Sequence, residues 1–86
     1  MKRKITIKKK RIEVHWYDHC SYRGWVDFDN ANDWCKEEAI INCTVGWLWY
    51  ENAKTLVVAQ TISQCQVSEL QKIIKQDICF RKILKS

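Results

Sequence analysis

The residue types that could carry covalent chemistry gather between positions 15 and 20 of the chain. Cys20 could act as a nucleophile beside His19 or His15, with Asp18 orienting the imidazole. Such catalysis needs a thiolate within hydrogen-bond reach of the imidazole. Neighbouring residues on an extended strand point to opposite faces, so Cys20 and His19 would not converge easily. Because no glycine run that could form an oxyanion hole accompanies them, we predict no catalytic residue and no enzyme activity.

The same residue types could instead hold a metal ion. The candidate ligands are His15, His19 and Cys20, joined by Cys35 or Cys43. Zinc needs four converging nitrogen and sulfur ligands, which usually come in two close pairs. This segment is typical of a strand that runs into a loop, and it contains no C-x-x-C pair. We therefore predict ordinary histidines near a strand end, with no metal and no cofactor.

Each of the two glycines directly precedes a tryptophan, as Gly24-Trp25 and Gly46-Trp47. Two glycines at this separation cannot form the glycine-rich cradle of a phosphate-binding loop, which excludes dinucleotide-fold and kinase-like functions. Glycine has no Cβ, so we expect Gly24 and Gly46 to let adjacent sheet segments approach closely. We expect Trp25 and Trp47 to fill the core, since tryptophan side chains are on average highly buried.

Charge is unevenly distributed along the chain. The formal net charge is +5, and residues 18–38 are rich in acids. Seven of the fifteen Lys and Arg residues lie in the first eleven positions, namely Lys2, Arg3, Lys4, Lys8, Lys9, Lys10 and Arg11. A basic block can bind phosphate or an acidic protein surface. Lysines can equally protect an edge strand from pairing, so residues 1–11 are either a basic arm or an edge strand.

Aromatic residues accompany these cations. Together with Arg23 and the basic block, they are the residue types that stack on bases and neutralise phosphates. They are Trp16, Tyr17, Tyr22, Trp25, Trp47, Trp49 and Tyr50. A small sheet with exposed aromatics would suit single strands or a nucleotide ligand. A nucleic-acid-binding regulator that uses residues 2–11 is therefore the alternative function to weigh against other kinds of binding.

Length and composition indicate a single domain over residues 1–86, because chains of 86 residues rarely form two cores. Five cysteines are an odd number, which predicts that most are reduced core or near-surface thiols rather than parts of a disulfide framework. No apolar run approaches the ~18 residues of a membrane span. The charged N-terminus is not followed by the apolar stretch of a secretory signal. We therefore expect a cytoplasmic protein with no membrane partner.

Hydrophobic periodicity predicts three strands. Ile12, Val14 and Trp16 alternate with polar residues, which places them on one face of the first strand. Residues 40–50 are the strongest strand candidate because their β-branched and aromatic content is high. Residues 55–62 should return as an antiparallel hairpin partner of that strand.

Two helices are expected beside these strands. A cap at Asp29 or Asn30 predicts a short helix over residues 31–38, with Trp34 and Cys35 facing inward. Residues 68–71 fit a capping box, and the apolar spacing that follows predicts one helix over residues 69–85. A short strand through Ile74, followed by a helix from about Gln76, is the alternative. The expected fold class is α+β: a mainly antiparallel sheet of three to five strands, a C-terminal helix and a short helix near Trp34.

Several short motifs run along residues 12–84. They are Trp16-x-Asp18, Gly24-Trp25, Thr44-Val45-Gly46-Trp47-Leu48, Val57-Val58-Ala59 and Ile73-Ile74-Lys75-Gln76-Asp77-Ile78, with Arg81 and Leu84 following. This pattern resembles that of a group of small uncharacterised phage and prophage proteins. Ile74 stands where those proteins usually have proline, and the lysine-rich arm is not part of their pattern. The resemblance favours a strand followed by a helix at the C-terminus, because proline would start a helix.

The resemblance implies a class of function rather than a chemistry. Small phage proteins without catalytic motifs often act as stoichiometric binders of host factors, including components or nucleotide signals of antiviral defence. We therefore expect a non-catalytic binding protein in the host cytoplasm, which blocks or sequesters a host protein or a nucleotide-like small molecule. A homodimer is a further expectation, since an edge strand and surplus aromatics invite symmetric pairing.

Four residues are the expected partner-binding site: Trp16, Asp18, Arg23 and Trp25. Arg23 would offer a forked donor to a phosphate or carboxylate. The two tryptophans would form a stacking wall, and Asp18 would accept hydrogen bonds or hold the loop in place.

Overall fold

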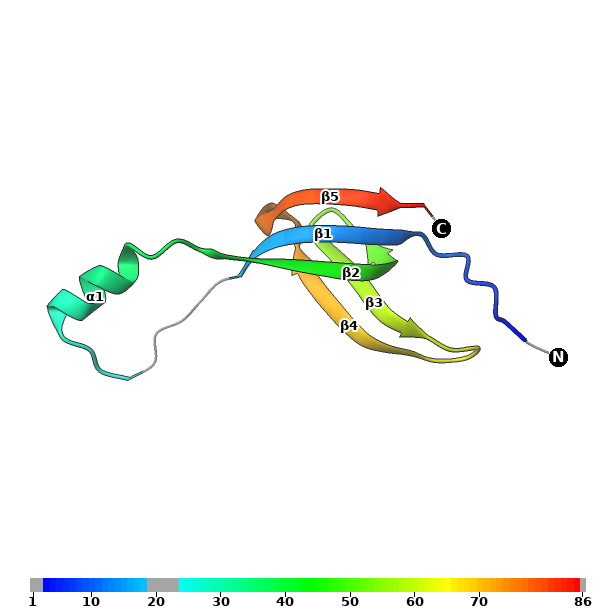
Figure 1. Cartoon of the computed structure of the whole chain (residues 1–86), viewed down its shortest axis with the longest axis horizontal. Helices are drawn as coiled ribbons and strands as arrows, with labels where there is room; N and C mark the ends of the chain where they lie inside the picture. The colour runs from blue at the N-terminus through cyan, green and yellow to red at the C-terminus, as the bar shows by residue number, and fades with distance from the viewer. Residues whose placement is uncertain (1–2, 19–23, 86) are drawn as a thin grey trace.

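The protein is built on a five-stranded antiparallel sheet with the strand order β4-β3-β2-β1-β5 (Figure 1). The computed structural model describes residues 3–18 and 24–85. Its elements are β1 (Arg11–Asp18), α1 (Phe28–Cys35), β2 (Ile40–Glu51), β3 (Thr55–Ile62), β4 (Val67–Ile74), the 3-10 helix η1 (Lys75–Asp77) and β5 (Ile78–Leu84). The last strand returns to the first, so β1 lies between β2 and β5. The three predicted strands are confirmed as β1, β2 and β3.

The sheet curves enough to enclose its own core. Ile12 and Val14 on β1 are fully buried and pack with Leu56 and Val58 on β3 and with Ile73 on β4. Strands β1 and β3 are not neighbours in the sheet, so this contact requires the sheet to fold over. Trp16, Leu48 and Ile78 pack around the same cluster. The predicted inward face of β1 is therefore confirmed.

At Gly46, β2 approaches β3 too closely to leave room for a Cβ. A Cβ at this position would overlap the carbonyl oxygen of Ala59 and come within 2.7 Å of Val58 Cγ1. The expected close approach is confirmed at Gly46. Gly24 is different, because its φ of +90° needs glycine while a Cβ there would meet nothing within 4 Å. Glycine at position 24 serves backbone conformation, and the expected close packing at that position is wrong.

A bulge near Trp49 breaks the alternation of β2. The register against β3 shifts between Leu48 and Tyr50, so Tyr50 lies opposite Val57 and Glu51 lies opposite Leu56. Strict alternation along β2 would place Leu48 and Tyr50 on one face, and the bulge separates them. Its consequence is that Glu51 faces the same side of the sheet as the core residue Leu56.

The predicted C-terminal helix is wrong. Residues 67–74 form β4 and pair with β3, and residues 78–84 form β5 and pair with β1. Between them only η1 is helical. The alternative strand through Ile74 is confirmed, but the helix expected after Gln76 is a strand. Sheet pairing prevails because it buries Ile73 against Leu56 and packs Ile78 on the core, which outweighs a weak local preference for helix.

The short helix near Trp34 exists, but it begins earlier and does not pack inward. Asp27 caps α1 by accepting a hydrogen bond from the Asn30 backbone N–H at 2.8 Å. No residue of α1 is buried, and Cys35 is exposed. In Figure 1 the helix stands well away from the sheet, at the opposite end of the molecule from the N-terminal arm. The molecule is accordingly elongated, with extents of 63 × 23 × 22 Å.

Candidate functional site

The described residues of the segment that joins β1 to β2 are mostly exposed. We call its described residues, 24–39, the β1–β2 extension. Trp25 is fully exposed, and Phe28 at the start of α1 is 88% exposed. Large aromatic side chains are costly to leave in water, because each buries about 150–250 Å² when it is covered. The β1–β2 extension therefore presents two unused apolar contact groups.

At the base of the β1–β2 extension, Trp34 is less exposed than Trp25 and Phe28. Trp34 is half-buried and lines a hollow of about 260 Å³ together with Asp18, at the end of β1, and Ile40, at the start of β2. The hollow also includes Glu37 and Glu38. Trp34 thus lies near the strand ends, whereas Trp25 and Phe28 are exposed.

The structure places the three described residues of the four-residue predicted site in different surroundings. Trp16 lies against the core, and its indole Nε1–H donates to Thr44 Oγ1 at 3.0 Å. Asp18 is half-buried at the base of the β1–β2 extension. Trp25 is fully exposed, which makes its expected core position wrong. Trp47 is half-buried on β2, and Arg23 lies outside the described residues.

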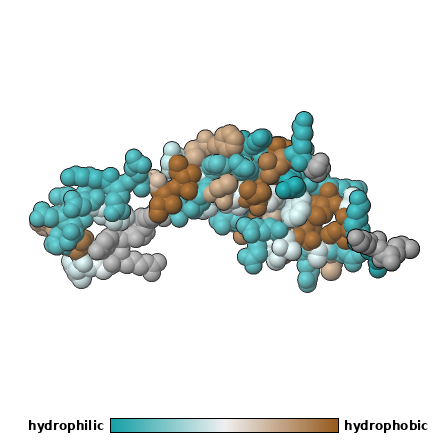
Figure 2. Space-filling model, viewed as in Figure 1, coloured by the Kyte–Doolittle hydropathy of each residue, from teal (hydrophilic) through white to brown (hydrophobic). Residues whose placement is uncertain are grey.

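The β1–β2 extension is strongly acidic. It carries one cation, Lys36, against five carboxylates, Asp27, Asp29, Asp33, Glu37 and Glu38. Figure 2 shows its end of the molecule as largely hydrophilic, with the apolar residues on that face gathered mainly over the sheet. Its field therefore attracts cationic surfaces and repels anions such as nucleotides.

A basic groove lies at the other end of the molecule. Residues 4–9 of the N-terminal arm and the turn at residues 62–67 line it, with Trp49 between them, and its volume is about 660 Å³. Lys9 places its Nζ 4.9 Å from the centre of the Trp49 ring and donates to the Trp49 carbonyl oxygen at 3.1 Å. Lys4 and Lys8 complete the basic wall. A cation beside an aromatic ring suits an anionic ligand that also stacks.

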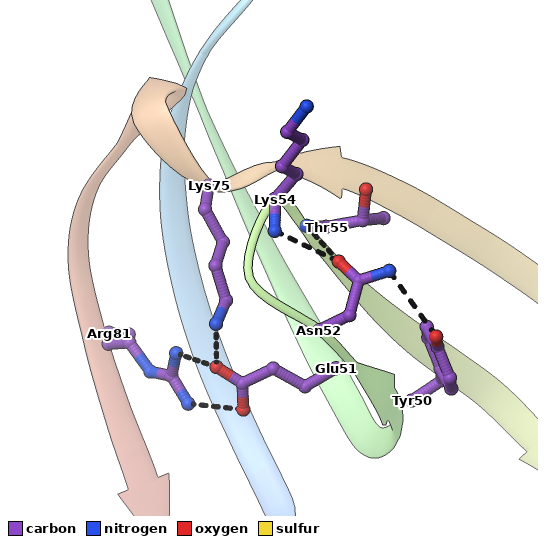
Figure 3. A network of polar contacts seen from close by, with 7 residues as sticks. All are labelled: Tyr50, Glu51, Asn52, Lys54, Thr55, Lys75 and Arg81. Atoms are coloured by element: carbon purple, nitrogen blue, oxygen red, sulfur yellow. Dashed lines mark hydrogen bonds and ion pairs between the residues drawn. The ribbon is translucent and has the colours of Figure 1, made fainter.

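A charged network closes the corner between β2, η1 and β5 (Figure 3). Arg81 donates from both terminal nitrogens to Glu51, at 2.8 and 3.2 Å, and Lys75 Nζ pairs with the same carboxylate. The hydrogen bonds from Arg81 and Lys75 lower the pKa of Glu51 from 4.5 to about 2. The Glu51 carboxylate in turn raises the pKa of Arg81. This network joins three elements and leaves the carboxylate paired, so its role is structural.

The turn beside this network is held by Asn52. Its side-chain oxygen accepts hydrogen bonds from the backbone N–H groups of Lys54, at 2.9 Å, and Thr55, at 2.8 Å. The Lys54 carbonyl then accepts from the N–H of Lys75 at 2.8 Å. Figure 3 shows Asn52 between these partners and Tyr50. The local turn thereby positions η1 against the β2–β3 hairpin.

The described cysteines, Cys35, Cys43, Cys65 and Cys79, are all free and exposed. Their expected reduced, near-surface state agrees with this placement. Among the described residues one group of metal-ligand types comes together, Glu13, His15 and Cys43. No helix in residues 3–18 and 24–85 is long and apolar enough to cross a membrane.

No protein-family model, curated protein or solved structure matches this chain. Its function must therefore be inferred from the residues and their geometry. The sequence pattern did not single out Phe28, whose exposure depends on α1 standing clear of the sheet. Nor did it pair Lys9 with Trp49, because 40 positions separate them and only the fold brings them together.

Proposed function

We propose that this chain is a non-catalytic binding protein that blocks or sequesters a host factor, and that the β1–β2 extension makes the contact. The observation that carries the proposal is the exposure of Trp25 and Phe28 on a segment whose helix buries none of its residues. An isolated helix shorter than about 12 residues is marginal in water. A partner that covers the two aromatic side chains would supply the apolar contacts that α1 lacks.

The chemistry of the β1–β2 extension favours a protein as the partner. Aromatic anchors surrounded by charge are typical of residues that dominate protein–protein binding energy. The five carboxylates call for a basic rim on the partner, around a pocket that takes an aromatic side chain. They disfavour a nucleotide at this end of the molecule. The resemblance to phage proteins supports a host protein as the class of partner.

The test is capture of the host partner by the purified chain, compared between matched variants. We expect Trp25→Ala and Phe28→Ala each to weaken binding at least tenfold, since anchors of this kind cost about 2 kcal/mol or more when truncated. Phe80→Ala removes a half-exposed aromatic residue from β5 and is the control, which should bind as the parent does. A captured protein whose affinity is the same for all three variants would refute the proposal.

A second candidate function, the binding of single-stranded nucleic acid, is supported by a separate observation, the groove beside the N-terminal arm. Lys4, Lys8 and Lys9 with Trp49 could hold the backbone and one base of a single-stranded nucleic acid. We rank this function second because Lys9 already lies over the Trp49 ring. A base would have to displace it or use the other ring face.

Oligonucleotide affinity measured against salt tests this second function. Three phosphate contacts predict a slope of about −2 for log affinity against log salt concentration. Replacing Lys4 and Lys8 by glutamine should flatten the slope, while replacing Lys82 and Lys85 on the C-terminal segment removes the same charge and should not. A flat salt dependence in the parent chain would reject the nucleic-acid function.

A further inference from the structure

We propose that Glu13, His15 and Cys43 form a binding site for a zinc ion on the convex face of the sheet. Their ligand atoms, one from each side chain, all lie within 4.8 Å of one another. His15 and Cys43 are direct cross-strand partners on β1 and β2. Glu13 lies two residues before His15, so both side chains leave the same face of β1.

The fold holds these side chains close to a ligating arrangement. His15 Nε2 donates to Glu13 Oε2 at 2.8 Å, and the imidazole ring rests edge-on against Phe80, with ring centres 5.0 Å apart. A zinc ion held at about 2.0–2.1 Å by nitrogen and oxygen would separate the two atoms to about 3.3 Å. Tetrahedral zinc with Zn–S of about 2.3 Å sets sulfur and nitrogen about 3.6 Å apart, so from separations within 4.8 Å the sulfur closes by at most about 1.2 Å. Changes of this size need side-chain adjustment only.

The donor set selects the metal. A thiolate, an imidazole and a carboxylate are the ligands that zinc takes in proteins, whereas calcium and magnesium prefer oxygen alone. The carboxylate and the thiolate together carry the two negative charges that balance a divalent ion. Because Cys43 is exposed, the fourth coordination position is open to water or to a ligand from another molecule. Bound zinc would cross-link β1 and β2 at their middle.

Strand pairing creates this site, and no spacing motif shows it. His15 and Cys43 are 28 positions apart, and their approach depends on the register of β1 against β2. A register shifted by one residue would send the two side chains to opposite faces. The site is independent of the β1–β2 extension, so its failure would leave the proposed function standing.

Titration of the reduced full chain with Co²⁺, used as a spectroscopic substitute for zinc, tests the site. We expect one ion per chain, with a sulfur-to-cobalt charge-transfer band and the visible absorption of tetrahedral cobalt. Cys43→Ser should abolish the charge-transfer band, and His15→Asn and Glu13→Gln should each weaken binding at least about tenfold, as loss of metal-site partners does. Addition of zinc should raise the melting temperature of the parent but not of Cys43→Ser.

Two controls separate this site from other thiols. Cys65→Ser and Cys79→Ser remove exposed cysteines outside the cluster and should leave the cobalt spectrum and affinity unchanged. Circular dichroism of each metal-free variant shows whether it is folded. Cobalt binding that survives in Cys43→Ser, or that is lost only in Cys20→Ser, would overturn the proposal. Absence of binding at millimolar cobalt would do so as well.

Discussion

Two single residues lie where neighbouring elements of this small sheet meet closely. Gly46 is one of them, because β2 and β3 approach each other there without room for a Cβ. Glu51 is another, because its carboxylate is the acceptor that joins η1 and β5 to β2. Gly46 stood out in the sequence as one of two glycines that directly precede a tryptophan, whereas the role of Glu51 emerges only from the fold.

Gly46→Ala should destabilise the protein by about 2 kcal/mol, the usual cost of forcing a methyl group into a packed interior. The added methyl group meets the backbone oxygen of Ala59, which cannot rotate away. Urea unfolding followed by circular dichroism measures the change. Gly24→Ala is the comparison: its added methyl meets nothing, so its cost of about 1–2 kcal/mol comes only from the φ of +90°, which is strained for alanine.

Stability should fall in acid as Glu51 takes up a proton. Its pKa is about 2 in the folded protein against 4.5 for an unperturbed carboxyl. Because folding lowers this pKa, the stabilisation is fully present above pH 4.5 and is lost as the pH falls toward 2. The network is partly exposed, so we expect a contribution of about 1 kcal/mol.

Glu51→Gln isolates this effect. The variant should be less stable than the parent at pH 7 and should show a shallower loss of stability between pH 4.5 and 2. Urea midpoints across that range measure it. Glu38→Gln also removes one negative charge but lies in the β1–β2 extension, so it should follow the parent. Parallel acid curves for Glu51→Gln and the parent would show that the pair contributes nothing.

Among the elements, α1 and its flanking residues contribute least to folding. No residue of α1 is buried, and the core is assembled from β1, β3 and β4. Elements with little burial belong to the low-stability part of a protein, from which binding segments are commonly drawn. We therefore expect the sheet to fold without the β1–β2 extension, which in the proposed function serves to bind the partner.

Replacing residues 19–39 by Asn-Gly should therefore leave the sheet folded. Asp18 and Ile40 are the last pair of the β1–β2 ladder, so a two-residue hairpin turn can join them. We expect the free energy of unfolding to change by less than about 1 kcal/mol, because the shorter loop also costs less entropy to close. A loss much greater than this, measured by urea unfolding, would show that the β1–β2 extension supports the core.

The whole molecule is much less compact than a typical domain of the same length. A compact domain of 86 residues has a radius of gyration of about 12 Å, whereas the Cα atoms here give 17.6 Å. The excess comes from the β1–β2 extension at one end and the N-terminal arm at the other (Figure 1). Acidic and basic groups are thereby held at opposite ends.

Small-angle X-ray scattering can check this shape. We expect a radius of gyration well above 12 Å for the parent chain and a clear decrease when residues 19–39 are replaced by Asn-Gly. The forward scattering gives the molecular mass, which tests the expected homodimer; the edge strands of the observed sheet are β4 and β5. A compact parent with an unchanged radius in the variant would mean that the β1–β2 extension folds back on the sheet.

The strands β1, β2 and β3 could be predicted because alternation of apolar and polar residues is a local property of the chain. The free cysteines, the basic N-terminal segment and the acidic segment at residues 18–38 could likewise be predicted from composition alone. Local spacing failed at the C-terminus, where the intervals around Leu70, Ile73 and Ile78 fit a helix. There, pairing with β3 and β1 buries Ile73 and packs Ile78 against the core.

The binding features depend on contacts that no local pattern encodes. Lys9 meets Trp49, Glu51 meets Arg81 and His15 meets Cys43 across 28 to 40 positions of sequence. Likewise, the sequence marks Trp25 as a large aromatic residue, but its exposure follows from where the β1–β2 extension stands relative to the sheet. The sequence by itself determines the side-chain types and the alternation of apolar and polar residues along each strand. Strand register, sheet curvature and side-chain exposure are determined only when distant strands pair and bury a common core.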